Sequence, residues 1–408
     1  MKGFQKEETF NISLFSDFIF SRVNLTYTFL PGSSDMNRVF EAMNNRGKQL
    51  DHHELLKSRL LEKIESHERL AYSLIWDACS NMNAYVEKNI KDVGNLTWKN
   101  LYGDTSGLYE DDGLEKSKIG LDKVDIIKLL KEIQTNDKES ISLKSILEST
   151  ANYSRTEKDK NVKESDYLSK SVRRIISFPT FLLHVLRVYQ LQNNGTHSAE
   201  VIDKKLLSIF DVASNFNTSE KTKEFILLIW KARVSFDKYI IKWVYSADEK
   251  EEYHEIEQVV ISKSVIKNKD GSTNENISVQ RVENTDEDIK CLSKLQGMLY
   301  HSQEMTTQYW ITPFLYILIN EQLSNTALLK KLEVLETTLF YSVKNTSKLK
   351  DRTFNIVFQN ESEELECLVD SKSYLNKCLG TGYPNYIFYK LEYILWKDRV
   401  GICEEKGL

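Results

Sequence analysis

The sequence predicts a mainly α-helical protein, a helical array with a small, incomplete α+β piece at its N-terminus and a β-hairpin insertion. Only 15 glycines and 4 prolines occur in 408 residues, which leaves little room for the many turns of an all-β protein. Hydrophobic residues make up 41% of the chain and charged residues 28%, a balance typical of globular proteins. Apolar residues also recur at helical spacing, as at Leu70, Leu74 and Ala78.

The predicted elements divide the chain into three regions, residues 1–66, 67–250 and 251–408. The first region begins with a helix near Leu14–Phe20, which leads to a strand-like run at Val23–Leu30. This run has no partner strand within the region, and an unpaired strand edge is a liability. We therefore expect the first region to be an incomplete domain.

Two short helices joined by a tight turn end the first region. The first helix is expected at Asp35–Met43 and the turn at residues 44–47. The second helix is expected to begin after Asp51, which is spaced from Glu54 as in a capping box.

The second region reads as helices separated by polar connections. Helices are predicted at His67–Lys88, at Val124–Ile133, at Leu143–Leu147, from about Tyr167 to the Phe178-Pro179 step, at Thr180–Gln192 and at Ser219–Tyr245. Residues 89–117 and 151–165 are expected to be irregular. Pro179 is expected to restart a helix, because its ring disrupts a helix interior.

The third region combines a hairpin with further helices. Runs at Ile256–Ile266 and Ile277–Val282 alternate in places and flank a polar turn that contains Asp270-Gly271, which predicts a β-hairpin. The helices expected after it lie at about 284–304, 310–322 and 324–342, and in the tail at Tyr386–Trp396.

The turn of the first region carries the most suggestive chemistry. Asn44 and Asn45 offer amide donors and acceptors, Arg46 offers a planar fork suited to phosphate, and Lys48 adds a second cation. Gly47 lacks the Cβ atom that restricts a chain leaving a helix. Asn-Arg-Gly between amphipathic helices is also ordinary turn chemistry. The residues alone leave both interpretations open.

The histidines do not predict a metal site. His52 and His53 are adjacent, so they point about 100° apart on a helix, and no H-E-x-x-H spacing occurs. His184 lies among leucines and valines, which favours a packed core histidine over a catalytic one. No Gly-rich phosphate loop, G-x-S-x-G elbow or Ser/His/Asp arrangement is found, so no catalytic residue is predicted.

Three lysines share one face of the helix predicted at Ser219–Tyr245. Lys231, Lys238 and Lys242 are spaced i, i+7 and i+11. A solvated face explains them, and a DNA-facing stripe is the alternative, because rows of cations supply the salt-dependent part of DNA affinity. The net charge of −5 means that any DNA contact would need such a local patch.

The remaining composition points to the cytoplasm. None of the five cysteines has C-x-x-C spacing, which suggests reduced thiols. The first ten residues contain no apolar signal-peptide core, and the longest apolar run, Phe225–Trp230, is far too short to span a membrane.

Residues 40–61, FEAMNNRGKQLDHHELLKSRLL, closely resemble the signature of the GmrSD-like family. These are prokaryotic defence proteins related to modification-dependent restriction endonucleases. The matching positions are Phe40, Glu41, Asn44, Arg46, Gly47, Lys48, Leu50, Leu55, Leu56 and Lys57. The lead-in at Leu14–Ile19 and Arg22–Leu25 is also similar to the family, and Tyr386–Tyr393 resembles the helix that leads into its HNH nuclease domain.

The resemblance implies a nucleotide-dependent nuclease that acts on modified foreign DNA, with GTP or ATP and Mg²⁺ as cofactors. Residues 1–66 would be the C-terminal remnant of a ParB/sulfiredoxin-like nucleotide-binding domain. The residues implied at the nucleotide are Asn44, Asn45, Arg46, Gly47, Lys48 and Lys57. Arg46 and Lys48 would contact phosphate, the asparagines would shape or bind the pocket, Gly47 would permit the turn, and Lys57 would reach the same anion.

Both catalytic motifs of the family are absent from the sequence. No Asp-Gly-Gln-Gln-Arg string occurs, and none of the four prolines completes a His-x-x-Pro motif. We therefore expect the chain to be the sensor and linker portion of such an endonuclease, which does not catalyse cleavage alone. A partner chain or domain would supply the missing motifs.

Two alternatives are a non-catalytic interaction subunit of a split defence system and a helical DNA-binding module. The sequence also leaves open whether the chain forms a homo-oligomer.

Overall fold

The structure is a computed structural model, and its contacts separate into two compact units. One comprises Met1–Asp51 with Gln134–Lys163, and the other His52–Ile133 with Glu164–Leu408. The residues that the structure describes are 15–17, 21, 51–102, 121, 124–136, 167–168, 171–193, 199–213, 216–246, 251–267, 273–302, 307–341, 348–358, 376–378, 380–382 and 385–406. Nearly all of these belong to the second unit. The predicted three-part division stays a prediction.

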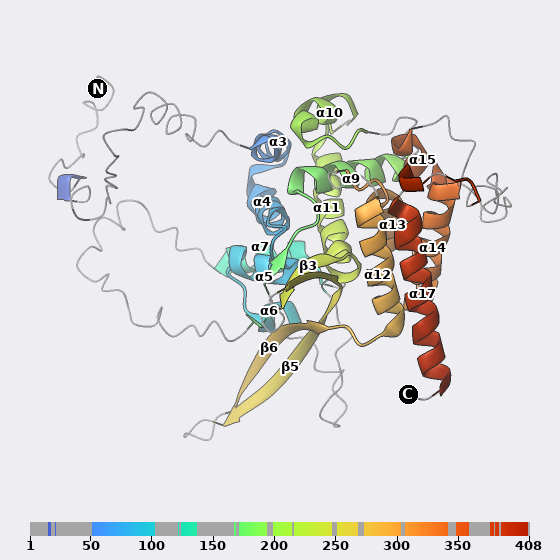
Figure 1. Ribbon diagram of the computed structural model, residues 1–408. Coiled ribbons are helices and arrows are strands. Elements are labelled where there is room, and N and C mark those ends of the chain that lie inside the picture. The colour runs from blue at the N-terminus through green and yellow to red at the C-terminus, as the bar shows by residue number, and fades with distance from the viewer. Residues whose placement is uncertain are drawn as a thin grey trace, which may run out of the picture. The chain divides into compact units, whose positions relative to one another are not determined.

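Helices dominate the second unit, as predicted, and small sheets complete it (Figure 1). The helices up to the hairpin are α3 His52–Leu61, α4 Ser66–Ser80, α5 Val86–Val93, α6 Trp98–Tyr102, α7 Ile126–Asn136, α9 Phe178–Gln192, the 3₁₀ turn η4 Asp203–Lys205, α10 Leu206–Ala213 and α11 Ser219–Tyr239. Those after it are α12 Glu287–Ser302, α13 Ile311–Asn320, α14 Asn325–Tyr341, α15 Leu349–Asn355, the 3₁₀ turns η5 Ile356–Phe358 and η6 Gly380–Gly382, and α17 Asn385–Lys406. The predicted helices at Asp35–Met43 and Leu143–Leu147 and the strand at Val23–Leu30 lie outside the described residues.

Helix α9 is the centre of the core. It begins at Phe178, two residues before the predicted start at Thr180, with the Ser177 hydroxyl accepting a hydrogen bond from the Thr180 amide and Pro179 in the first turn. Its sequence is apolar around the whole circumference, which is the pattern of a helix buried on every side. The Phe181 ring meets the Phe236 ring of α11 edge-on, with centroids 5.5 Å apart.

A buried histidine on α9 is held in one tautomer, as expected for a packed core residue. His184 Nε2 lies 2.9 Å from the Thr307 carbonyl oxygen, which can only accept, so Nε2 carries the proton. Nδ1 must then accept from the Thr312 hydroxyl at 2.8 Å. That hydroxyl oxygen in turn accepts from Arg187 Nε at 2.9 Å. Burial lowers the pKa of His184 to about 3, so the ring stays neutral.

Arg187 joins α9 to the segments around it. Its guanidinium is completely buried, and burial lowers its pKa to about 10. It donates to the carbonyl oxygens of Ala199 and Lys350, both at 2.8 Å, and to the Thr353 hydroxyl at 3.0 Å. A buried cation needs such partners because desolvation without hydrogen bonds is costly.

The prediction of a single helix at His67–Lys88 is wrong, because the structure has two helices there, α4 and α5, with a break between them. Asn81 is extended (φ −79°, ψ 93°), and its side chain accepts from the Asn83 amide at 3.1 Å, a local turn that competes with the helix. Asn89 then donates to the carbonyl oxygens of Ala78 and Asn81, at 2.9 and 2.8 Å. These bonds satisfy carbonyl groups that the end of α4 leaves without helical partners. Helices α5 and α6 also occupy part of the stretch expected to be irregular.

Helix α11 ends six residues earlier than predicted. Ile240 is extended (φ −113°, ψ 136°), and the chain continues as strand β3, Lys242–Ser246. Gln296 of α12 marks the change, because its side chain donates to the Tyr239 carbonyl oxygen at 2.7 Å and accepts from the Ile241 amide at 3.1 Å.

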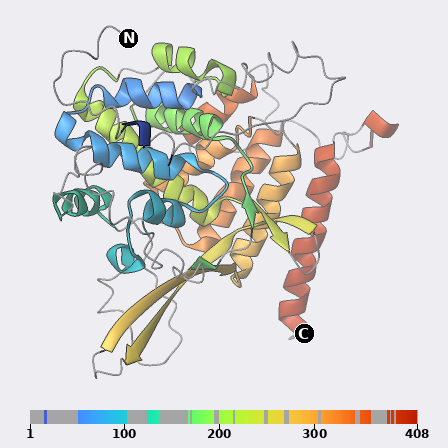
Figure 2. The ribbon, with the colours of Figure 1, turned by 90° about the vertical axis from the view of Figure 1, so that its left-hand side faces the viewer.

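Two small sheets contain the strands. The predicted hairpin is confirmed: β5 Glu257–Lys267 pairs antiparallel with β6 Thr273–Glu283, from Glu257 opposite Glu283 to Lys267 opposite Thr273. The hairpin extends away from the helices in both ribbon views (Figures 1 and 2). The prediction of a helix from Tyr167 is wrong, because the chain forms two short strands there. β1 Tyr167–Leu168 pairs parallel with β6, and β2 Val172–Arg173 pairs with β3, whose other neighbour is β4 Glu251–Glu255.

The three helices predicted after the hairpin are confirmed as α12, α13 and α14. Helix α12 lies against both α14 and α17 (Figure 1). In the part of the chain described, no helix is long and apolar enough to cross a membrane. Cys79, Cys291 and Cys378 are free thiols.

We expect stability to fall as the pH drops below 6.5. The pKa of His184, and that of half-buried His254, is lowered to about 3, chiefly by burial. Between pH 6.5 and pH 3 these two histidines therefore bind protons in the unfolded chain but not in the folded chain. The free energy of unfolding is thus unaffected by them above pH 6.5 and decreases as the pH falls towards 3. Each group contributes a slope of up to about 1.4 kcal/mol per pH unit.

Urea unfolding between pH 7.5 and 5.0 measures this slope before the carboxylates titrate in the unfolded chain. His184→Gln should reduce the slope, whereas His67→Gln, at an exposed position on α4, should leave it unchanged. Equal slopes for the wild type and His184→Gln would show that His184 titrates normally.

Candidate functional site

The structure describes one of the six predicted phosphate-site residues. Asn44, Asn45, Arg46, Gly47 and Lys48 lie outside the described residues. Lys57 is on α3, where its Nζ donates to both carboxylate oxygens of Asp77 on α4, at 2.7 and 2.6 Å. Its side chain is 20% exposed, and its charge is paired with that carboxylate. The proposed contact between Lys57 and an anion stays a prediction.

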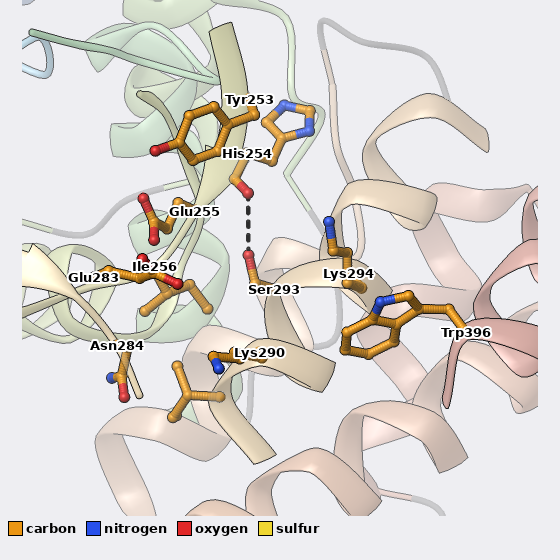
Figure 3. A pocket seen from close by; sticks show the side chains of 11 residues that line it. Tyr253, His254, Glu255, Ile256, Glu283, Asn284, Lys290, Ser293, Lys294 and Trp396 are labelled. Carbon is orange, nitrogen blue, oxygen red and sulfur yellow. Dashed lines mark hydrogen bonds between the residues drawn. The ribbon is translucent and has the colours of Figure 1, made fainter. Parts of the chain in front are cut away.

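A separate pocket of about 170 Å³ opens where the base of the hairpin meets α12 and α17 (Figure 3). It is lined by Tyr253, His254, Glu255, Ile256, Glu283, Asn284, Ile289, Lys290, Ser293, Lys294 and Trp396. The ends of β4 and β6 form one wall and α12 the opposite wall. Trp396 of α17 closes one side.

Buried ion pairs fix the strand wall. Arg281 of β6 donates to both carboxylate oxygens of Glu87 on α5, at 2.6 and 3.1 Å, and to the carbonyl oxygen of Glu257 at 2.9 Å. The Tyr85 hydroxyl donates to the Glu257 carboxylate at 2.7 Å, and the Arg281 guanidinium lies 4.0 Å from the Tyr85 ring centroid. These contacts hold both strands at the point where they reach the pocket.

Asp237 of α11 continues this network. Its carboxylate bonds to Arg233, to Lys242 at 3.1 Å and to the Val86 amide at 2.7 Å. Burial alone would raise the pKa of Asp237, but the cations outweigh it and the pKa is lowered. Burial lowers the pKa of Lys242 to about 8.

The lysine stripe considered for DNA does not form. Lys231 and Lys238 are exposed on α11, but Lys242 is on strand β3, buried beside Asp237. The stripe required the helix to run on to Tyr245, and it ends at Tyr239.

The helix wall is fixed by bonds to the strands. The Ser293 hydroxyl donates to the His254 carbonyl oxygen at 3.3 Å, the bond drawn in Figure 3. One turn further along α12, Gln296 makes its two bonds to the end of α11. The His254 ring lies against Trp243, with centroids 3.8 Å apart, and 5.3 Å from the His301 ring. Burial, with His301 and Arg173 nearby, keeps this histidine neutral at pH 7.

Helix α17 reaches α14 through polar side chains. Tyr386 and Lys390 both donate to the buried carboxylate of Glu336, and burial raises the pKa of that carboxyl. One heptad on, Tyr393 and Lys397 donate to Glu333 at 2.7 and 2.6 Å. This ladder fixes the rotation of α17 and brings Trp396 to the pocket.

The charges of the lining balance. Glu255 and Glu283 come from the strand side, and Lys290 and Lys294 come from α12. Lys290 also pairs with Glu287 at 2.9 Å, which raises the lysine pKa. With His254 neutral, the four charged lining side chains are two acids and two bases.

Sequence reasoning singled out none of the residues of this pocket. They come from four segments that no motif links, at residues 253–256, 283–284, 289–294 and 396. The available signal was the i, i+4 spacing of Lys290 and Lys294, which a solvated helix face explains equally well. Within the described ranges, no group of three or more His, Cys, Asp or Glu side chains could hold a metal ion.

Comparison with known proteins adds no relative. No protein-family model, no curated protein and no solved structure gives a significant match to the chain.

Removing Glu87 tests the network behind the strand wall. Glu87→Gln should lower the free energy of unfolding by about 3 kcal/mol or more, because it leaves Arg281 buried without its carboxylate. Asp211→Asn breaks a surface pair with Arg59, whose side chains are 53% and 65% exposed, and should cost at most about 1 kcal/mol. Urea unfolding compares the two, and equal losses would contradict a stabilising network.

Proposed function

We propose that the chain is the sensor and linker portion of a GmrSD-like, nucleotide-dependent defence endonuclease that acts on modified foreign DNA. The observation that carries this proposal is the set of ten matching positions within residues 40–61. The chain binds GTP or ATP with Mg²⁺ at the turn after Met43 and is not catalytic alone. A partner chain or domain supplies the Asp-Gly-Gln-Gln-Arg and His-x-x-Pro motifs.

The second half of the signature lies within the described residues. Helix α3 begins at His52, and residues 48–51 separate it from the expected turn in sequence. It is held against the core by Leu56 and Leu60, both almost fully buried, and by the bond between Lys57 and Asp77.

The chemistry assigned to the turn follows from its side chains. Arg46 offers a bidentate fork to phosphate and Lys48 offers a point charge. Asn44 and Asn45 bind or shape the nucleotide pocket, and Gly47 permits the turn. Lys57 would have to exchange Asp77 for phosphate, so we assign it the weakest contribution.

Arg46→Ala should weaken binding of the Mg²⁺ complex of GTP or ATP at least about tenfold, the loss expected for a charge-assisted bond. The thermal melt should barely change. Calorimetric titration measures the affinity, and Lys205→Ala, at an exposed position in η4, is the matched control. A lower melting temperature with unchanged affinity would make Arg46 structural.

One observation favours a second candidate, the non-catalytic interaction subunit. The α17 face that is turned away from the Tyr and Lys ladder carries Phe388, Leu391, Ile394 and Leu395, which are 53%, 53%, 42% and 59% exposed. Four large apolar side chains within eight residues of one helix are characteristic of an interaction surface. The partner expected here is the protein that supplies the missing catalytic motifs, since α17 resembles the helix that leads into the family's nuclease domain.

The double variant Leu391→Gln/Leu395→Gln should abolish a complex with the product of an adjacent gene. It should also melt like the wild type, because these side chains are exposed in the chain alone. Co-expression followed by size-exclusion chromatography with mass determination tests this, with Val212→Gln on α10, 90% exposed, as the control. A complex that survives the double variant would remove α17 from the interface.

A further inference from the structure

We propose that the outer face of α17 binds an amphipathic helix of a partner protein, and that lysine or arginine flanks the apolar stripe of that helix. The proposal rests on the second candidate function above, in which α17 holds a partner, and it names the chemistry of that partner. Three features carry it: the fixed rotation of α17, the spacing of its exposed apolar side chains and the sign of the charges beside them.

The ladder of Tyr and Lys side chains keeps the apolar face of α17 outside the fold. Lys390 pairs with the buried carboxylate of Glu336, and Lys397 pairs with Glu333 at 2.6 Å. Exchanging the two faces of the helix would leave a buried carboxylate without its cation, which is costly. Figure 2 shows α17 at the edge of the helical body. The outer face therefore stays available to a partner while the fold is intact.

The exposed apolar side chains of α17 have the spacing by which one helix packs on another. Phe388, Leu391 and Leu395 are exposed at positions i, i+3 and i+7, so they form one stripe about two turns long. Ile394 widens this stripe on one side. Anchors at i, i+3 or i+4, and i+7 are those of helix-in-groove recognition, in which the side chains of one helix insert between those of another. The stripe therefore fits a single helix of a partner.

The accessible charges beside this stripe are negative. The charged residues in the described part of α17 whose exposure is defined, residues 385–398, are Lys390, Glu392, Lys397 and Asp398. The two lysines are engaged in the ladder, whereas Glu392 and Asp398 are exposed. Glu392 lies within one turn of both Phe388 and Leu395, and Asp398 lies within one turn of Leu395. Lysine or arginine beside the partner's stripe would meet these acids, and such complementarity selects partners.

The same acids disfavour the other occupants of an apolar helix face. If two copies of the chain paired through α17, Glu392 and Asp398 would meet carboxylates, and like charges repel. Helices that lie on a membrane surface carry Lys and Arg on their polar face, because anionic lipids attract them. A basic amphipathic helix satisfies both the stripe and the acids beside it.

Two designed helical peptides of three heptads separate the apolar from the charged contribution. Both have Leu at positions a and d; the basic peptide has Lys at e and g, and the acidic peptide has Glu there. Fluorescence anisotropy with the full chain should show saturable binding of the basic peptide, and the acidic peptide should bind at least about tenfold more weakly. Leu391→Gln/Leu395→Gln should abolish binding and melt like the wild type, because both side chains are exposed.

The charge variant Glu392→Gln/Asp398→Asn should remove most of the preference for the basic peptide, since the apolar stripe stays. Glu220→Gln/Asp92→Asn is the matched control, because it neutralises one exposed Glu on α11 and one exposed Asp on α5. The control should keep the preference of about tenfold, which depends on charges next to the stripe.

The proposal is overturned if the folded wild-type chain does not bind the basic peptide, if the acidic peptide binds as tightly, or if binding survives Leu391→Gln/Leu395→Gln. Size-exclusion chromatography with mass determination tests the second copy. A wild-type dimer that this double variant makes monomeric would assign the face to another copy of the chain. Vesicles of phosphatidylserine and phosphatidylcholine test the membrane, and binding that the double variant abolishes would assign the face to lipid. Either result also overturns the proposal.

The peptide titration needs neither nucleotide nor the product of an adjacent gene. If that product binds α17 while the two peptides bind equally well, the interaction function stands and the basic helix is wrong. If the basic peptide is preferred and no gene product binds, the second candidate function is wrong and the specificity of the α17 face stands.

Discussion

Six charged side chains lie buried where α5 and α11 meet the base of the hairpin. They are Glu87, Asp237 and Glu257, with Arg233, Lys242 and Arg281. Desolvating so many charges is tolerable only if their signs balance and their hydrogen bonds are met, and here three acids face three bases. The network ties residues near 85, 237, 257 and 281 into one piece, so the relative positions of these four segments are fixed together.

That piece determines where the pocket forms. The start of β5 and the end of β6 lie beside the pocket and are held from inside by Arg281 and Glu257. Gln296 joins the opposite wall to the end of α11 with two bonds from one amide. The pocket therefore belongs to the stable part of the fold, although four charged side chains line it.

Local patterns predicted the elements and missed their ends. The hairpin and helices α12 to α14 follow from periodicity and turn residues, which are properties of neighbouring positions. The end of α11 depends on Gln296, and the strand at Tyr167 depends on β6, both far along the chain. In the same way, the signature identified Lys57, whereas its partner Asp77 and the whole pocket required the fold.

Helix α17 has an unusual division of polarity. The Tyr and Lys side chains on its inner face bond to two carboxylates, and its outer face is apolar. Salt screens exposed ion pairs, whereas buried pairs are screened much less. The Glu336 carboxylate is buried and the Lys397–Glu333 pair is partly exposed, so the two steps of the ladder respond differently to ionic strength. A rise in ionic strength would weaken the attachment of α17 near Lys397 and leave the part near Tyr386 in place.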